Sequence, residues 1–292
     1  MKLGIVGVGL LGSAVASRAR AAGIEVRGYD NRPDAVTPLV ASGVRLAESV
    51  AEAAAGMDAV LTVLSTPAAV ESVWLDQHGL IATAAVTTTL LQMSTISPAL
   101  SVRLGEAAAA RGLRFLEVPM SGTSTLVMRG GGTLFVGGDP AVAEATRPLL
   151  EAIAAKVIYV GPVGDASVAK LAANLIGGLN AIALAEALVL GAKAGVAPAR
   201  LLAALKESPV RNGAMDMRGP LMVAHDFPPH IRLDLFLKDF TLMLEEGKRL
   251  GMPLPLTSVA HQLCTATSAA GRGDQDLAAV ITTLEHLAGM NP

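Results

Sequence analysis

The sequence KLGIVGVGLLG at residues 2–12, followed by IEVRGYD at residues 24–30, decides the fold of this chain. An apolar stretch precedes three glycines spaced as GxGxxG, a helical stretch follows them, and a second apolar stretch ends at Asp30. This order is typical of the strand–turn–helix–strand unit that binds dinucleotides. The sequence therefore predicts a doubly wound Rossmann sheet in the N-terminal part of the chain.

Each glycine of this turn has a physical role. Gly7 allows the tight turn, Gly9 lets the backbone approach a pyrophosphate, and Gly12 lets the helix pack closely on the strand. The helix that begins near Leu10 offers its unpaired N–H groups and the positive end of its dipole to phosphates. Asp30 lies eighteen residues after Gly12, close to the spacing of about twenty at which a carboxylate binds ribose hydroxyls.

The residues after the second strand bear on the choice of cofactor. Asp30 accepts hydrogen bonds from ribose hydroxyls and repels a 2′-phosphate, which favours NAD. Arg32, two residues further on, carries a guanidinium that can pair with that phosphate, so NADP stays open. We expect NAD as the cofactor. Leu11 and Asn31 are further predicted contacts of this segment with the cofactor.

The first segment has two alternative interpretations. Lys2, the apolar residues 3–11 and the small residues 14–16 imitate a secretory signal, but a signal explains neither the glycine spacing nor a following strand that ends in an aspartate. A purely structural glycine turn is the second alternative, because a single GxGxxG is a weak motif.

Composition narrows the function. The chain has 292 residues, a formal net charge of −2 and 16% charged residues, which gives no general basic field for nucleic acid or an anionic membrane. Its single cysteine, Cys264, excludes an intrachain disulfide, and its five histidines are scattered. We therefore expect no metal site and a reducing, cytoplasmic location.

The chain pattern predicts two domains. Apolar stretches alternate with helical ones up to residue 160, which indicates a mainly parallel sheet with helices on both faces; the expected strands are 2–6, 24–29, 59–64, 89–93, 113–118, 133–136 and 157–160. The rest is helical, with expected helices at 166–194, 199–206, 233–250, 256–270 and 275–287. We predict a Rossmann domain at 1–163 and an all-α domain for substrate binding and dimerisation at 164–292, joined by the long helix.

That long helix raises the question of a membrane span. Residues 171–190 are apolar and long enough to cross a bilayer. Asn174, Asn180 and Glu186 would each need a partner in hydrocarbon, and alanine and glycine supply much of the remainder. The sequence therefore favours a helix buried inside a protein or a dimer, with no transmembrane segment.

Three loops follow predicted strands, where ligands bind in open α/β sheets. They are residues 65–67 (Ser-Thr-Pro), 94–98 (Ser-Thr-Ile-Ser-Pro) and 119–124 (Pro-Met-Ser-Gly-Thr-Ser). Hydroxyl side chains beside glycine can present several hydrogen-bond donors to a carboxylate. Serine and threonine also favour turns for local reasons, and we assign Ser97 and Ser124 to that role.

Lys170 is the most informative residue outside the glycine turn. It precedes Asn174 by four residues, so the two side chains share one face of the predicted long helix and can converge on one substrate oxygen. Partial burial disfavours the charged form of a lysine. It therefore moves the lysine pKa toward the range in which the side chain can exchange a proton with a hydroxyl or carbonyl. An ordinary solvated lysine at the start of a helix is the alternative.

Taken together, these motifs resemble the β-hydroxyacid dehydrogenase family, which includes 3-hydroxyisobutyrate dehydrogenases and tartronate semialdehyde reductases. The resemblance covers nearly the whole chain and rests on four segments in the family's order: the glycine turn 7–12, residues 117–122 (Glu-Val-Pro-Met-Ser-Gly), the segment 161–174 with its glycines, lysine and asparagine, and Lys238-Asp239.

The resemblance implies roles for individual residues. Lys170 is implied as the catalytic acid/base and Asn174 as a substrate ligand. Ser121 and Gly122 are implied to bind the substrate carboxylate. The remaining implied contacts are Thr123 at the substrate and, at the cofactor, Leu64, Ser65, Thr66, Ser94, Thr95 and Lys238.

The chain departs from the family pattern at two positions of the segment 117–123, which the resemblance implies to include the substrate loop. Thr123 stands where a second glycine is usual, and Glu117 stands where an aspartate is common. The 6-phosphogluconate dehydrogenases carry a histidine just before the asparagine, where this chain has Ala173. Imine reductases replace the lysine, so Lys170 argues against them.

The resulting hypothesis is an oxidoreductase that transfers a hydride between NAD(P) and a small 3-hydroxy acid or its semialdehyde. The expected partners are a small carboxylate substrate and further copies of the same chain, as a homodimer or homotetramer. The open alternatives are a regulatory module that binds a dinucleotide without turnover, an imine reductase, and an enzyme like 6-phosphogluconate dehydrogenase.

Overall fold

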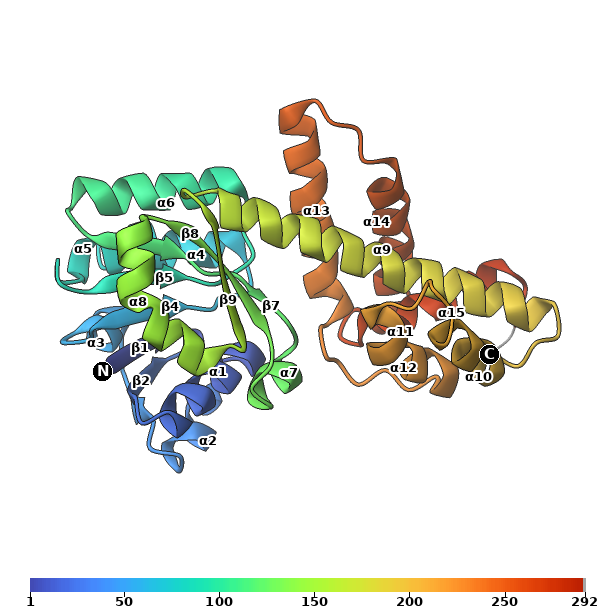
Figure 1. The fold of residues 1–292 in the computed structure, drawn as a ribbon, viewed down its shortest axis with the longest axis horizontal. Helices are drawn as coiled ribbons and strands as arrows, with labels where there is room; N and C mark the ends of the chain where they lie inside the picture. The colour runs from blue at the N-terminus through green and yellow to red at the C-terminus, as the bar shows by residue number, and fades with distance from the viewer. Residues whose placement is uncertain (291–292) are drawn as a thin grey trace. The chain divides into compact units, whose positions relative to one another are not determined.

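The chain folds into two compact units. The structure is a computed structural model that describes residues 1–290, and the units are Met1–Lys170 and Leu171–Pro292. The long helix α9 (Asp165–Lys193) begins in the N-terminal unit and continues into the C-terminal one (Figure 1). The sequence placed the domain boundary at residues 163 and 164, whereas the division falls seven residues later, inside this helix.

The N-terminal unit is an α/β sandwich. Its strands are β1 (Lys2–Val6), β2 (Glu25–Tyr29), β3 (Arg45–Leu46), β4 (Ala59–Thr62), β5 (Thr89–Gln92), β6 (Arg114–Glu117), β7 (Met120–Ser121), β8 (Thr133–Gly138) and β9 (Lys156–Gly161). Its helices are α1 (Leu10–Ala21), η1 (Pro33–Ala35), α2 (Thr37–Val40), α3 (Val50–Ala54), α4 (Pro67–Leu75), α5 (Leu80–Thr83), α6 (Pro98–Ala110), α7 (Ser124–Met128) and α8 (Pro140–Ile153).

The strands form one sheet in the order β3-β2-β1-β4-β5-β6-β8-β7, and β9 pairs with β8. The first six strands of that order are parallel, β8 is antiparallel to both β6 and β7, and β9 is parallel to β8. The connection from β7 to β8 spans only residues 122–132, and such a short link suits antiparallel neighbours. The predicted Rossmann sheet is confirmed. The short strand β7 lies within the loop that follows β6.

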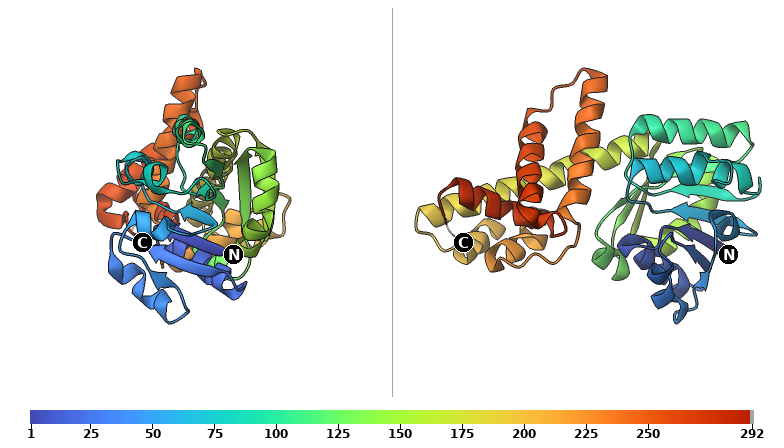
Figure 2. Two further views of the ribbon diagram at one scale, coloured as in Figure 1. Left: turned by 90° about the vertical axis from the view of Figure 1, so that its left-hand side faces the viewer. Right: turned by 180° about the vertical axis from the view of Figure 1, so that it is seen from behind.

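Side chains from alternate positions of the strands form a core on each face of the sheet. Leu61 and Leu116 pack with apolar residues of α1, α7 and α8 on one face. Val60 and Phe115 pack with residues of α3, α4, α5 and α6 on the other. This alternation follows the two-residue period of a strand, and Figure 2 shows the sheet between its helices.

The C-terminal unit is helical. Besides most of α9 it contains α10 (Pro198–Lys206), α11 (Gly213–Met217), α12 (Gly219–Ala224), α13 (Leu233–Leu250), α14 (Pro255–Thr267), η2 (Ser268–Arg272), η3 (Leu277–Ala279) and α15 (Val280–Leu287). Its core gathers residues from these helices, among them Leu184 of α9, Phe240 of α13 and Cys264 of α14. The predicted all-α region is confirmed.

Helix α9 is long and apolar enough to cross a membrane by length and composition alone, with a mean hydropathy of 1.8 and 39% of that stretch buried. In this structure Ala181, Leu184, Ala185 and Leu188 of α9 belong to the core of the C-terminal unit. One face of the helix is therefore packed on protein.

Candidate active site

The glycine turn is shaped by its own packing. Gly7 has a φ of +92°, and a Cβ there would lie 2.2 Å from the carbonyl oxygen of Val63. A Cβ at Gly12 would lie 2.0 Å from the carbonyl oxygen of Gly7. Both positions require glycine, because α1 and the end of β4 approach the turn too closely for a side chain.

Gly9 differs from these two glycines. A Cβ at Gly9 would meet no atom within 4 Å among the described residues, so packing inside the unit does not account for a glycine there. Gly9 is also the N-cap of α1, and at this described position no side chain accepts a hydrogen bond from the first N–H groups of the helix. The first N–H groups of α1 are therefore available to an anion, and the turn fits the pyrophosphate of a dinucleotide.

Asp30 is fixed beside the turn. Its Oδ2 accepts a hydrogen bond from the Val8 N–H at 2.8 Å, and its Oδ1 accepts one from the Arg32 N–H at 3.0 Å. The Nε of Arg32 lies 3.6 Å from the same Oδ1, and the Arg32 side chain is 74% exposed. The structure thus brings the three predicted cofactor elements together: the turn, Asp30 and Arg32.

The loops after β4 and β5 are tied to each other. The hydroxyl of Ser94 accepts a hydrogen bond from the Leu64 N–H at 2.7 Å, while Gln92 holds the Ser94 backbone on both sides. Thr66 caps α4 through the Ala69 N–H, and Ser97 caps α6. Four predicted residues of these loops, Leu64, Ser65, Thr66 and Ser94, thus lie at the ends of neighbouring strands.

The loop at residues 119–124, for which the sequence predicts substrate binding, has a defined geometry at all three predicted positions. Ser121 is half-buried in β7, opposite Thr133 of β8. Gly122 has a φ of +150°, and a Cβ there would lie 3.2 Å from the Cα of Gly132. Thr123 is the N-cap of α7 and accepts a hydrogen bond from the Leu126 N–H. A side chain at Gly122 would strain the backbone, so Ser121 is the cleaner position for testing carboxylate binding.

Lys170 is buried, with 8% of its surface exposed, although it lies only five residues after the start of α9. Asn174 follows one turn later on the same helix, as the sequence predicted. The Nδ2 of Asn174 donates a hydrogen bond to Oδ2 of Asp239 at 2.7 Å. Because a carboxylate only accepts, this bond fixes which end of the Asn174 amide faces Asp239.

Asp239 contacts two of the predicted site residues, and the sequence analysis gave it no role. It is buried in α13, and its Oδ1 pairs with Nζ of Lys238 at 2.9 Å. One carboxylate therefore joins two predicted residues, Asn174 and Lys238. The only sequence signal was the adjacent pair Lys238-Asp239, which does not reveal a partner 65 positions away.

The described residues offer neither a reactive cysteine nor a metal-binding cluster. Burial raises the pKa of the Cys264 thiol to about 12, so it is a core side chain and not a nucleophile at neutral pH. Among residues 1–290, no group of three or more His, Cys, Asp or Glu side chains is placed to hold a metal ion.

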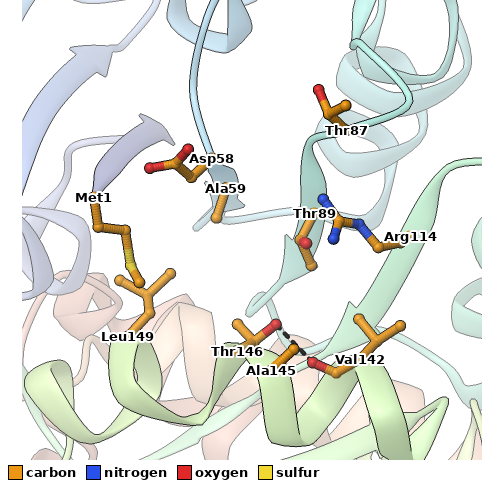
Figure 3. A pocket seen from close by; sticks show the side chains of 10 residues that line it. All are labelled: Met1, Asp58, Ala59, Thr87, Thr89, Arg114, Val142, Ala145, Thr146 and Leu149. Carbon is orange, nitrogen blue, oxygen red and sulfur yellow. Dashed lines mark hydrogen bonds between the residues drawn. The ribbon is translucent and has the colours of Figure 1, made fainter.

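A cavity of about 250 Å³ lies at the amino ends of the parallel strands, whereas the glycine turn follows the carboxyl end of β1. Its lining includes Asp58, Thr89 and Arg114, which lie where strands begin, and residues of α8 (Figure 3). Dinucleotides bind at the carboxyl ends of parallel strands. This cavity is therefore not the cofactor site.

Comparison with known proteins gives the class of the molecule. Residues 2–161 match the NAD-binding domain of 6-phosphogluconate dehydrogenase, and residues 164–284 match the NAD-binding region of NADP-dependent 3-hydroxyisobutyrate dehydrogenase. The chain is an NAD(P)-dependent oxidoreductase of hydroxy acids.

Individual relatives narrow this class. The chain is 32% identical to the 2-(hydroxymethyl)glutarate dehydrogenase of Eubacterium barkeri over 100% of this chain and 97% of the relative. It is 31% identical to the 2-hydroxy-3-oxopropionate reductase of Escherichia coli over 99% of this chain and 98% of the relative. The protein belongs to the β-hydroxyacid dehydrogenase family, which confirms the resemblance seen in the sequence.

Solved structures agree. The 3-hydroxyisobutyrate dehydrogenase of Salmonella typhimurium superposes with a TM-score of 0.88 at 31% identity, over 97% of this chain and 99% of that one. An imine reductase of Myxococcus stipitatus shares the fold, with a TM-score of 0.66 at 20% identity over 97% of this chain and 100% of that one.

Proposed function

We propose that the protein interconverts a small 3-hydroxy acid and its semialdehyde, with Lys170 as the general acid/base. The carrying observation is a buried lysine one helical turn before an asparagine whose amide is oriented by Asp239. In oxidation, the Lys170 amine takes the proton of the substrate hydroxyl; in reduction, the ammonium returns it to the carbonyl oxygen. NAD(P), when bound, accepts or supplies the hydride.

The other predicted residues orient the two ligands in this proposal. Ser121 and the backbone at Gly122 bind the substrate carboxylate, with Thr123 beside them, and Asn174 holds the reacting hydroxyl. The glycine turn with Leu10 and Leu11 binds the pyrophosphate. The remaining proposed cofactor contacts are Asp30, Asn31, Arg32, Leu64, Ser65, Thr66, Ser94, Thr95 and Lys238.

The substrate class also rests on the relatives. Their names specify 2-(hydroxymethyl)glutarate, L-threonate, L-serine and 3-hydroxyisobutyrate. All four are small carboxylic acids that carry a hydroxyl group. The first experiment is therefore reduction of NAD and of NADP by the purified protein with each of these acids. Cofactor binding without turnover on any of them would favour a regulatory module instead.

The role of Lys170 has its own test. Lys170→Ala should lower kcat by about two to four orders of magnitude, the usual contribution of general acid/base catalysis. Lys170→Arg should not restore kcat, because arginine keeps its proton near neutral pH. Cofactor affinity, measured by NAD(P)H fluorescence, should stay near wild type. An alanine variant within a few-fold of wild-type kcat would remove Lys170 from the mechanism.

Ser121→Ala tests the substrate end. It should raise KM for the acid with little change in cofactor affinity, because it removes one hydrogen bond to the carboxylate. An unchanged KM would place carboxylate recognition on another loop.

We also propose that the enzyme is a cytoplasmic homodimer or homotetramer. Large apolar side chains are exposed on the C-terminal unit, among them Ile176 and Leu190 of α9 and Leu256 and Val259 of α14. Apolar surface of this kind favours association with a further copy. Light scattering coupled to gel filtration measures the state, and a monomer at micromolar concentration would contradict it.

A further inference from the structure

Glu117 is a carboxylate buried completely at the end of β6, with 0% of its surface exposed. Its Oε1 accepts hydrogen bonds from the N–H groups of Gly164 and Ala166, both at 2.7 Å. Its Oε2 accepts hydrogen bonds from the hydroxyls of Ser101 and Ser167, both at 2.6 Å. Two oxygens thus receive four donors, which satisfies a buried carboxylate through hydrogen bonds.

The surroundings leave room for the length of a glutamate. A Cβ at Gly137 would lie 2.4 Å from Oε1 of Glu117, so a side chain at that position would collide with the carboxylate. The two backbone donors come from the N-terminal end of α9, where the helix dipole also favours a negative charge. The carboxylate therefore sits in a compartment shaped for it.

Three of the four bonds connect the parts of the N-terminal unit to which we assign the chemistry. Gly164, Ala166 and Ser167 lie at the start of α9, and Ser167 is three residues before Lys170, on the same face of the helix. In the other direction, the chain leaves Glu117 directly into the substrate loop 119–124. A displacement of Glu117 would move both the proposed acid/base and the proposed carboxylate site.

We propose that Glu117 is a positioning residue for the reaction: it locks the first turn of α9, and with it Lys170, to the strand that begins the substrate loop. This inference rests on the proposed role of Lys170. Proton transfer requires heavy atoms within about 3 Å of each other, and small misplacements of reacting groups cost large factors in rate. The lock then controls kcat more than cofactor affinity.

Two serines provide a matched pair to test the lock. Ser101 and Ser167 are both buried, and both donate to the same Oε2 at the same distance. They differ in that Ser101 belongs to α6, whereas Ser167 belongs to the helix of Lys170. Ser101→Ala and Ser167→Ala remove the same bond from the same acceptor, so a general effect on stability should be shared.

The expected result is a difference in catalysis between the two variants. Ser167→Ala should lower kcat by about tenfold and shift the midpoint of the pH–kcat profile, while Ser101→Ala stays within about twofold of wild type in both. Thermal melting and cofactor affinity, measured on the same preparations, should change alike in the two variants.

Equal kcat values for the two serine variants, whether lowered or unchanged, would overturn the positioning role. A larger loss in Ser101→Ala would do the same. Lys170→Ala, assayed in parallel, separates this failure from that of the proposed function. If it is inactive while the serine variants match, only the positioning role fails; if it is active, the role of Lys170 fails.

Discussion

At the scale of single residues, Asp30 and its neighbour Arg32 favour different cofactors. The Val8 N–H holds the Asp30 carboxylate against the glycine turn, where it can accept from ribose hydroxyls, while the Arg32 side chain lies beside it and is mostly exposed. A carboxylate repels a 2′-phosphate, whereas a guanidinium binds one. We therefore expect the preference between NAD and NADP to depend on the balance between the Asp30 and Arg32 side chains.

Arg32→Ala should shift that preference toward NAD. Removing the guanidinium leaves Asp30 alone beside the ribose, so the ratio of kcat/KM with NAD to that with NADP should rise by about tenfold, equivalent to about 1.4 kcal/mol. Arg45→Ala is the control, because Arg45 is similarly exposed and pairs with Glu25 on the neighbouring strand. A ratio that stays constant or falls in Arg32→Ala would exclude Arg32 from cofactor choice.

Sequence spacing found the local relationships among these residues and missed the distant ones. The turn glycines, the Lys170-Asn174 pair and the position of Asp30 follow from short-range periodicity. Asp239 bonds to Asn174 across 65 positions, and Glu117 reaches Ser167 across 50. Such contacts depend on which elements pack together, and a single sequence does not encode that in its spacing.

At the scale of elements, α9 meets α13 at one glycine of an adjacent pair. A Cβ at Gly178 would lie 2.5 Å from a ring carbon of Phe236 and 2.7 Å from one of Phe240, whereas a Cβ at Gly177 would meet nothing within 4 Å among the described residues. The two rings pack edge to face with centroids 5.1 Å apart. Gly178 thus permits the close approach of the helices.

The two glycines should respond oppositely to alanine. Gly177→Ala should raise the free energy of unfolding by about 0.5–1 kcal/mol, because glycine is a poor helix former. Gly178→Ala should lower it by about 1–3 kcal/mol, because the methyl group must displace buried aromatic rings. Denaturant unfolding measures both. A stabilised Gly178→Ala would mean that the α9–α13 contact is looser than the structure indicates.

The long elements were predictable and the short ones were not. Helices α9 and α13 and the main strands of the parallel sheet appear at nearly the predicted positions, because each carries a sustained apolar pattern. The two-residue strands β3 and β7 and the short helices α11 and α12 were not predicted. A two-residue strand has no periodicity of its own and forms only because a neighbouring strand supplies its hydrogen bonds.

At the scale of the whole molecule, each unit has its own apolar core, and the N-terminal unit also has a fluorescent reporter. Trp74 is the single tryptophan of the chain and is fully buried in the N-terminal unit, against Phe115. The C-terminal unit instead depends on Asp276, which is completely buried. Its carboxylate pairs with the Arg218 Nε at 3.2 Å and accepts hydrogen bonds from the N–H groups of His230, Ile231 and Ala278.

We expect the two units to unfold separately, and Asp276→Ala tests this. The substitution leaves the Arg218 guanidinium buried and unpaired, so the free energy of unfolding of the C-terminal unit should fall by about 3–5 kcal/mol. The circular dichroism transition that reports loss of the helices of the C-terminal unit should move to a lower denaturant concentration. The Trp74 fluorescence transition, which reports the N-terminal unit, should keep its wild-type midpoint. Asp274→Ala is the control, because Asp274 is exposed two positions away. If the Trp74 midpoint moved together with the circular dichroism, the two cores would unfold as one cooperative structure.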